Sequence, residues 1–148
     1  MCTTTNLDPR SPDLREHMEC LAQFEATFED PTFRFGTWIP ARPMPHQGLV
    51  GPEFVLSDGA EAFVDALRAI GWVTPAFDAA AWSRTPEAQA LVGDEEALAR
   101  ATPEQLARLV AALVLRDSHD MGTLADAFES GLLLRIVRRA ATLRNAPA

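Results

Sequence analysis

The sequence predicts a mainly α protein: a compact helical domain of about six helices, with a Pro-rich N-terminal loop region that has room for one or two short strands. Three observations predict this class. Apolar residues recur at spacings of three and four, most densely over residues 102–143, which is typical of amphipathic helices. Capping signals precede several of these segments. Prolines and glycines punctuate residues 32–56, where they oppose long regular structure.

Composition favours one globular domain. The chain has 148 residues, of which 47% are apolar and 23% are charged, so a core can be buried without cross-links. We expect residues 1–12 to be a flexible lead and residues 13–144 to be a single helical domain. The net charge is −8, but residues 132–148 hold four Arg and no acid, so the remaining chain carries −12. Attraction to phosphate is electrostatic, so an acidic body disfavours nucleic-acid binding. We do not expect nucleic acid as the main partner.

Targeting and redox signals are few. Cys2 and Cys20 are the only cysteines, too few for a disulfide framework. The polar start is unlike a signal peptide, and no apolar run approaches the roughly 20 residues that span a bilayer. We expect a cytoplasmic protein without membrane contact.

The first helix is predicted from Pro12, with Ser11 as its N-cap, to the end signal Asp30-Pro31. Its apolar positions lie on one face: Leu14, Met18, Leu21, Phe24 and Phe28. His17 and Cys20 lie one turn apart and could be half of a metal site. Because the sequence has no second Cys/His pair, we expect no metal and no cofactor.

Residues 32–56 form a long Pro-rich segment. The alternation of Phe33 and Phe35 and the apolar run Phe54–Leu56 each favour a short strand. Trp38 and Phe54 are interpreted as aromatic side chains that pin this loop to the core. A loop of this length is uncommon unless it is functional or ordered by contacts, so it stays a candidate surface.

The central segments carry clear start and stop signals. Ser57-Asp58 begins a helix that ends at Gly71, with Phe63, Val64, Leu67 and Ile70 on its buried face. Thr85-Pro86 begins a short helix to about Val92, and residues 94–101 form a further turn or two. Asp78, beside Trp82, is a possible acid but is more simply a helix cap.

Residues 102–143 predict three successive helices. Thr102 and Gln105 form a capping box ahead of an apolar stripe: Leu106, Leu109, Val110, Leu113 and Val114. Gly122 opens a short helix, and Gly131 suits a left-handed position after it. The last helix is apolar nearly all round, so it is expected between other helices or against another chain.

Four segments in order resemble a family of small bacterial proteins that carry an uncharacterised domain of unknown function: LSDGAEAFVDAL, FDAAAW, LARATPEQLARLVAALV and GTLADAFESGLLLRIVRR. The resemblance covers Ser57–Leu143. It implies a helical domain and no established activity. The chain differs from the family pattern at Ala79, where a Trp is usual, and in the bend before Gly122, where His119 and Met121 replace more polar or basic groups.

A catalytic or metal site is one interpretation of the Arg116–Gly122 bend. Asp117, His119 and Asp120, with Asp78, are the candidate residues, because a His beside carboxylates can act as a general base. The structural alternative is a solvated bend in which Asp120 caps the next helix.

Residues 122–143 also match a DNA-binding helix-turn-helix. Ala127, Gly131 and Val137 have its spacing, and the later helix presents three basic residues: Arg135, Arg138 and Arg139. The opposing interpretation is a helical hairpin whose Arg side chains pair with the acidic body.

We therefore expect a non-catalytic protein-interaction or regulatory module that forms a homodimer or binds another protein. Its possible binding surface comprises five residues: Trp38, Trp82, Arg135, Arg138 and Arg139.

Overall fold

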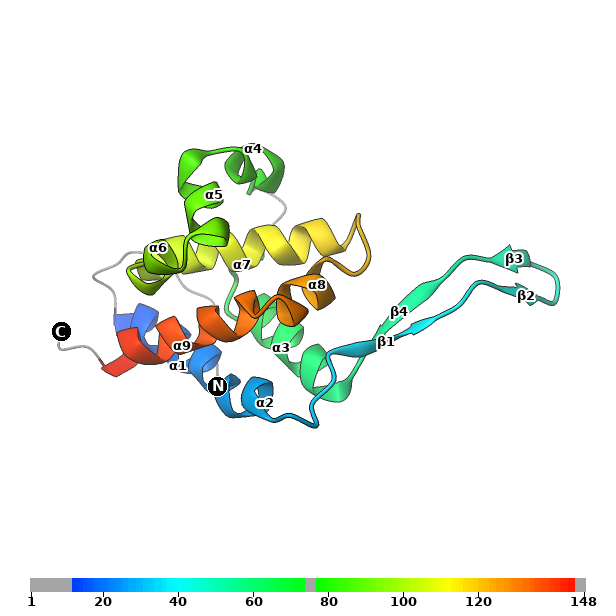
Figure 1. Cartoon of the computed structure of the whole chain (residues 1–148), viewed down its shortest axis with the longest axis horizontal. Helices are drawn as coiled ribbons and strands as arrows, with labels where there is room; N and C mark the ends of the chain where they lie inside the picture. The colour runs from blue at the N-terminus through cyan, green and yellow to red at the C-terminus, as the bar shows by residue number, and fades with distance from the viewer. Residues whose placement is uncertain (1–11, 74–76, 146–148) are drawn as a thin grey trace.

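A computed structural model describes residues 12–73 and 77–145, which form a helical body from which a β-hairpin projects (Figure 1). The mainly α prediction is confirmed, with a small sheet component. Residues 1–11 lie outside the described residues. They include most of the predicted flexible lead and Ser11, the predicted N-cap of the first helix. The helices are α1 (Pro12–Ala22), α2 (Glu25–Glu29), α3 (Asp58–Ala69), α4 (Ala79–Ser83), α5 (Pro86–Gly93), α6 (Glu95–Ala99), α7 (Pro103–Asp117), α8 (Thr123–Glu129) and α9 (Leu132–Asn145).

The described helices are shorter and more numerous than the six expected. The single helix predicted up to Asp30 is wrong: it divides into α1 and α2 at Gln23-Phe24. The Gln23 side chain donates to the Cys20 carbonyl at 2.8 Å, and the Phe24 amide bonds to the carbonyl three residues back. The apolar face nevertheless continues through both helices, since Met18, Leu21, Phe24 and Phe28 are all buried.

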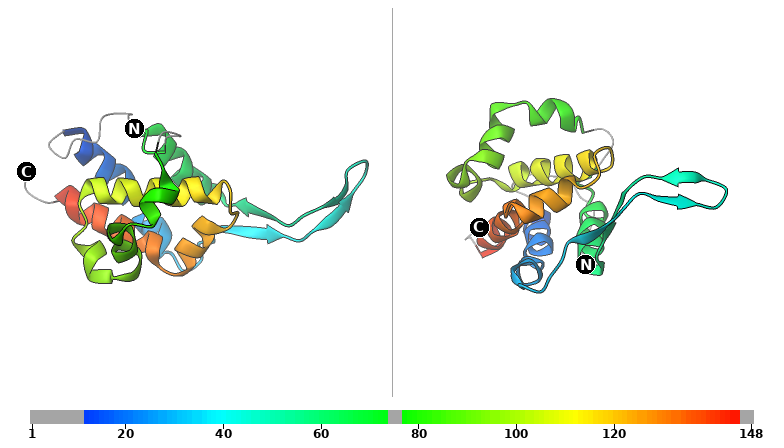
Figure 2. Two further views of the ribbon diagram at one scale, coloured as in Figure 1. Left: turned by 90° about the horizontal axis from the view of Figure 1, so that it is seen from above. Right: turned by 45° about the vertical axis from the view of Figure 1, so that its right-hand side comes forward.

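The last helix, α9, lies in the centre of the fold. It packs against α1, α2, α6, α7 and α8, and Leu133, Ile136 and Val137 on it are fully buried. Figures 1 and 2 show α9 between α1 and α7. The apolar side chains of α9 are therefore covered by other helices of the same chain.

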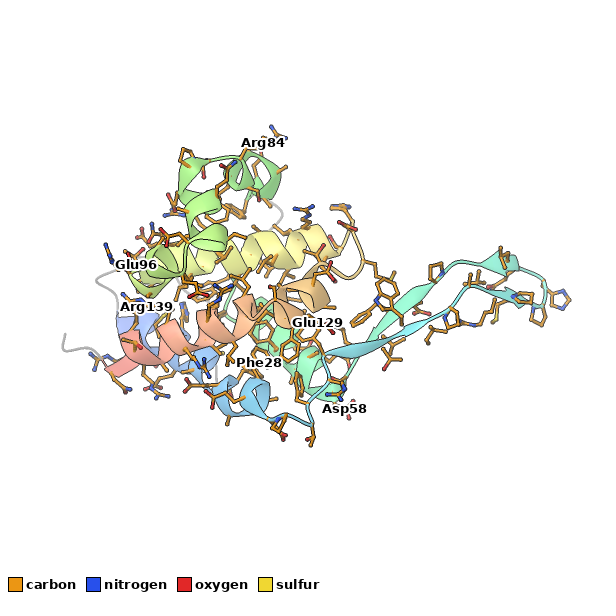
Figure 3. All side chains as sticks on the ribbon, viewed as in Figure 1. Phe28, Asp58, Arg84, Glu96, Glu129 and Arg139 are labelled. Atoms are coloured by element: carbon orange, nitrogen blue, oxygen red, sulfur yellow. The ribbon has the colours of Figure 1, made fainter. Side chains whose placement is uncertain are left out.

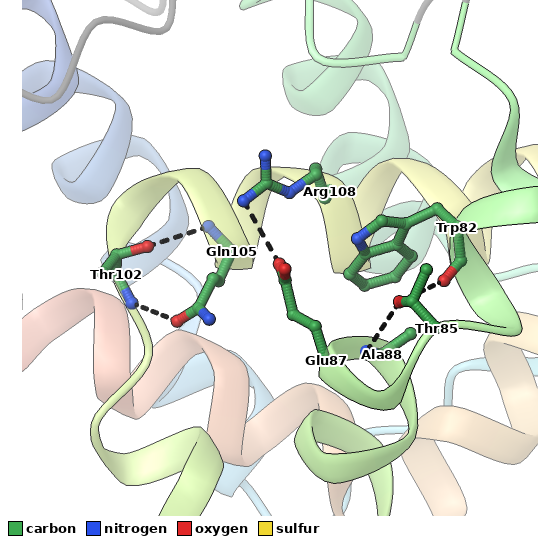
Figure 4. Close-up of polar contacts among 7 residues, drawn as sticks. All are labelled: Trp82, Thr85, Glu87, Ala88, Thr102, Gln105 and Arg108. Atoms are coloured by element: carbon green, nitrogen blue, oxygen red, sulfur yellow. Dashed lines mark hydrogen bonds and ion pairs between the residues drawn. The ribbon is translucent and has the colours of Figure 1, made fainter.

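Helix starts follow the predicted caps. Thr102 Oγ1 accepts from the Gln105 amide at 3.2 Å, and Gln105 Oε1 accepts from the Thr102 amide at 2.9 Å, which completes the capping box (Figure 4). Ser57 and Thr85 cap α3 and α5 in the predicted way. The expectation that Asp120 caps α8 is wrong, because Asp117 Oδ1 accepts from the Leu124 amide at 3.0 Å instead.

Residues 36–56 form a long antiparallel hairpin rather than an irregular loop. Its strands are β1 (Gly36–Ile39), β2 (Arg42–Met44), β3 (Gly48–Val50) and β4 (Glu53–Leu56). β4 pairs with β1, and β3 with β2, in one continuous register. Pro40 and Pro52 lie between the two pairs, where their missing N–H groups interrupt the ladder. The predicted strand at Phe54–Leu56 is confirmed, whereas the one at Phe33 and Phe35 is wrong.

An aromatic cluster joins the hairpin to the body. Phe28, at the centre of this cluster, lies within 6.4 Å, centroid to centroid, of Phe33, Phe35, Phe63 and Phe128. Figure 3 shows Phe28 above α2, beside the start of β1. Phe33 and Phe35 thus serve the core, and the hairpin begins only after them.

Candidate functional site

The projecting hairpin carries most of the exposed apolar side chains of the described residues. Trp38, Met44, Leu49 and Val55 lie on it, and Met121 lies at its base on the α7–α8 loop. We call these five residues the apolar hairpin surface. Leu49, close to the tip, is 75% exposed. The other large exposed apolar side chain of the described residues is Val92 on α5. The pairing register puts Trp38 and Met44 on one face of the hairpin and Leu49 and Val55 on the other, so the arm presents apolar side chains on both faces.

The base of the hairpin is held by specific contacts. The Trp38 and Phe54 rings meet edge to face, with centroids 5.2 Å apart. A Cβ added to Gly122 would lie 2.8 Å from Trp38 Cζ2, so the ring covers this glycine. The Phe54 amide donates to the Met121 sulfur at 2.9 Å. Trp38 therefore anchors the arm, as expected, while remaining 51% exposed.

The hairpin is closer to neutral than the body. Its charged side chains are Arg42 and Glu53, which lie 3.9 Å apart. The chain as a whole carries −8. A partner that contacts the hairpin therefore meets little of the acidic repulsion of the body.

A second feature is an open cleft of about 1060 Å³ between α3, α4 and the end of α7. Asp78 and His119 both line it, so the fold brings together two candidates that are 41 positions apart. Asp78 Oδ1 is engaged as the cap of α4, accepting from the Ala81 amide at 3.0 Å. Asp117 and Trp38 are not among the residues that line the cleft.

Both acids of the Arg116–Gly122 bend have contacts within the chain. Asp117 caps α8, and Asp120 lies 3.8 Å from Arg116 in an exposed pair. Among the described residues, no three His, Cys, Asp or Glu side chains are placed to hold a metal.

His17 and Cys20 lie in the core. His17 is fully buried, and its Nδ1 accepts from Trp72 Nε1 at 3.3 Å, with the rings edge to face. Cys20 is buried and is not a free thiol, and Cys2 lies outside the described residues. His17 and Cys20 therefore both lie on α1 in the packed core.

Trp82 packs between α4, α5 and α7. Figure 4 shows its ring beside Glu87 and Arg108, whose side chains pair at 3.1 Å. The Trp82 carbonyl accepts from Thr85 Oγ1 at 2.6 Å. The residue thus joins the start of α5 to α7 and is only partly exposed.

The basic residues of α9 bind the body of the same chain. Arg135 pairs with Glu95 at 3.3 Å, and Arg138 with Glu29 at 2.8 Å. Arg139 Nε donates to the Ala101 carbonyl at 2.9 Å, and partial burial lowers the Arg139 pKa. These contacts tie α9 to α2 and α6.

Sequence reasoning missed Met44 and Leu49 as surface residues. The signal available was that both are apolar while lying among prolines and glycines, where a core helix is excluded. Their strand pairing, which projects them, could not be read from spacing alone.

Fold and surfaces define a small, mainly α protein with a projecting apolar hairpin. Residues 14–146 match the model of a family of unknown function, DUF6508, and the chain belongs to this family. The match extends beyond Ser57–Leu143, so most of α1, all of α2 and the hairpin fall within the family's span. No curated protein and no solved structure matches the chain. No described helix is both long and apolar enough to cross a membrane.

Proposed function

We propose that this protein is a non-catalytic interaction module that docks onto a partner protein through the apolar hairpin surface. The observation that carries the proposal is the gathering of Trp38, Met44, Leu49, Val55 and Met121 on one projecting arm and its base. Burying a large apolar side chain contributes about 1.5–3 kcal/mol, so several of these contacts together can offset the cost of association.

The hairpin suits recognition by side chains rather than by strand addition. Pro40, Pro43, Pro45 and Pro52 are spread along it. Since proline cannot donate to a ladder, these residues protect the edges from continuous pairing with another strand. A partner is then selected by apolar pockets for the exposed side chains.

The alternatives have weaker support. A helix-turn-helix over residues 122–143 needs α9 to enter a groove, but α9 is central in the fold and Arg135, Arg138 and Arg139 already bond within the chain. A site at His119 has weaker support, because Asp78 and Asp117 both accept from helix amides and Asp120 lies 3.8 Å from Arg116 in an exposed pair.

Site-specific photo-crosslinking tests the proposal. A photoreactive phenylalanine analogue replaces Leu49 in one variant and Val92 in another, and each is expressed and irradiated in the cells that make the protein. Val92 is the matched control because it is a large exposed aliphatic residue, 49% exposed, on the helical body.

We expect a discrete protein adduct at position 49 and none at position 92. Mass spectrometry of the adduct distinguishes a second copy of the chain from a different protein. Equal adducts at both positions, or none at position 49, would contradict the proposal.

A further inference from the structure

Nearly every described Arg side chain interacts with the rest of the chain. Ion pairs engage those of Arg42, Arg100, Arg108, Arg116, Arg135 and Arg138. Hydrogen bonds engage those of Arg34, Arg139 and Arg144, and Arg15 also has an interaction. Among the described residues, only Arg68 and Arg84 have side chains without such a partner.

Both of these Arg residues line the cleft between α3, α4 and α7. Arg68 comes from the last turn of α3, and Arg84 is the C-cap of α4. Figure 3 shows Arg84 at the outer end of α4. Both residues are exposed, so a ligand can reach them from solvent, in a chain whose 21 acids outnumber its 13 basic residues.

Further basic groups border the same cleft. Arg116 and His119 line it, and within the described part of the chain the Arg116 side chain has only the exposed contact with Asp120 at 3.8 Å. An exposed pair of this kind contributes little and exchanges readily. The acid on the wall is Asp78, and its Oδ1 accepts from a backbone amide.

The remaining wall combines two polar residues, Ser83 and Gln89, with apolar ones that include four side chains: Val73, Phe77, Ala112 and Leu115. At about 1060 Å³, the open cleft is large enough to hold a ring system or a short acyl chain together with its headgroup.

We propose that this cleft binds an amphipathic organic anion, with its acidic headgroup on Arg68 and Arg84 and its apolar body on the wall. The planar guanidinium fork matches both carboxylate and phosphate oxygens, so the shared chemistry is an oxyanion joined to an apolar ring or chain. This site shares no residue with the apolar hairpin surface, so its test does not depend on the proposed function.

Calorimetric titration of the full chain with 1-naphthyl phosphate tests this site. 1-Naphthol and inorganic phosphate serve as probes that lack the charge or the apolar body. The test variant is Arg68→Gln with Arg84→Gln. The control is Arg100→Gln, which removes the exposed Arg that follows α6 as its C-cap and does not line the cleft.

We expect saturable binding of 1-naphthyl phosphate at least tenfold tighter than that of either partial probe. The double variant should weaken it tenfold or more, while the control stays within twofold and added salt weakens binding. Circular dichroism confirms that each variant is folded. Absence of saturable binding, equal affinity for 1-naphthol, or an equal loss in the control would overturn the proposal.

Discussion

Replacing Gly122 by Ala tests how the hairpin is attached to the body. Gly122 has φ +100°, and an added Cβ would lie 2.8 Å from Trp38 Cζ2. Gly131 is the matched control, because its φ is +86° and an added Cβ would meet no atom within 4 Å. The pair therefore separates backbone strain from displacement of the Trp38 ring.

The expected magnitudes follow from these two geometries. An Ala in the left-handed region costs roughly 1–2 kcal/mol, offset by about 0.4–1 kcal/mol from the reduced freedom of the unfolded chain. Gly131→Ala should therefore cost about 1 kcal/mol. At Gly122 the Trp38 ring must also shift, which disturbs its contact with Phe54, and an aromatic pair contributes about 0.5–1.5 kcal/mol. Gly122→Ala should then cost about 1 kcal/mol more than Gly131→Ala.

Urea unfolding followed by far-ultraviolet circular dichroism measures both free energies. The same two substitutions are repeated in a Trp38→Ala background, where the extra cost at Gly122 should largely disappear. The reasoning is refuted if the two glycine variants lose equal stability, or if the extra cost at Gly122 persists without Trp38.

Three further outcomes are expected. Thr102→Ala should lower the free energy of unfolding by about 1 kcal/mol, measured in urea, because it removes half of the capping box; an unchanged value would count against that role. Asp117→Ala should cost about 1 kcal/mol while Asp117→Asn costs little, since an Asn oxygen can still accept from the Leu124 amide; equal losses would point to a role for the charge. Hydrogen bonds from the Thr32 amide and then from its hydroxyl hold the pKa of Asp30 below its ordinary value. The contribution of these bonds to folding stability is therefore present above the ordinary pKa and is lost as pH falls through the lowered pKa. An NMR titration should show this lowered pKa, and Thr32→Ala should raise it part of the way, because the backbone amide remains; an unmoved pKa in the variant would exclude the Thr32 hydroxyl as a cause.

The helical body is largely predictable because its signals are local. The capping box at Thr102 marks the start of α7 through two hydrogen bonds between residues three apart. Gly122 and Gly131 mark bends because their backbones have positive φ. The break at Gln23-Phe24 was not predictable in this way, since the apolar face runs across it without interruption.

The hairpin was harder to predict because proline is a poor strand former. Pro40 and Pro52 read as loop residues, yet they lie opposite one another in a gap between two paired segments. Strand pairing depends on residues across the hairpin, such as Trp38 with Phe54, and a one-residue shift would reverse the faces.

The candidate site could be predicted only in part. Asp78 and His119, both candidates from the sequence, line one cleft. The two unpaired Arg residues that also line it were not among the candidates. Arg68 and Arg84 have no distinguishing local pattern, and their importance comes from what the fold leaves unpaired.

The measurement that tests the role of the hairpin most directly is the dissociation constant for the partner captured at position 49, compared between Leu49→Ser and Val92→Ser. Removing a buried Leu contact of about 1.5–3 kcal/mol should weaken binding roughly 10- to 100-fold. Val92→Ser, on α5 and away from the hairpin, should leave the constant within about twofold of the parent. Equal affinities for all three proteins, or a larger loss for Val92→Ser, would contradict the proposal that the hairpin is the contact surface.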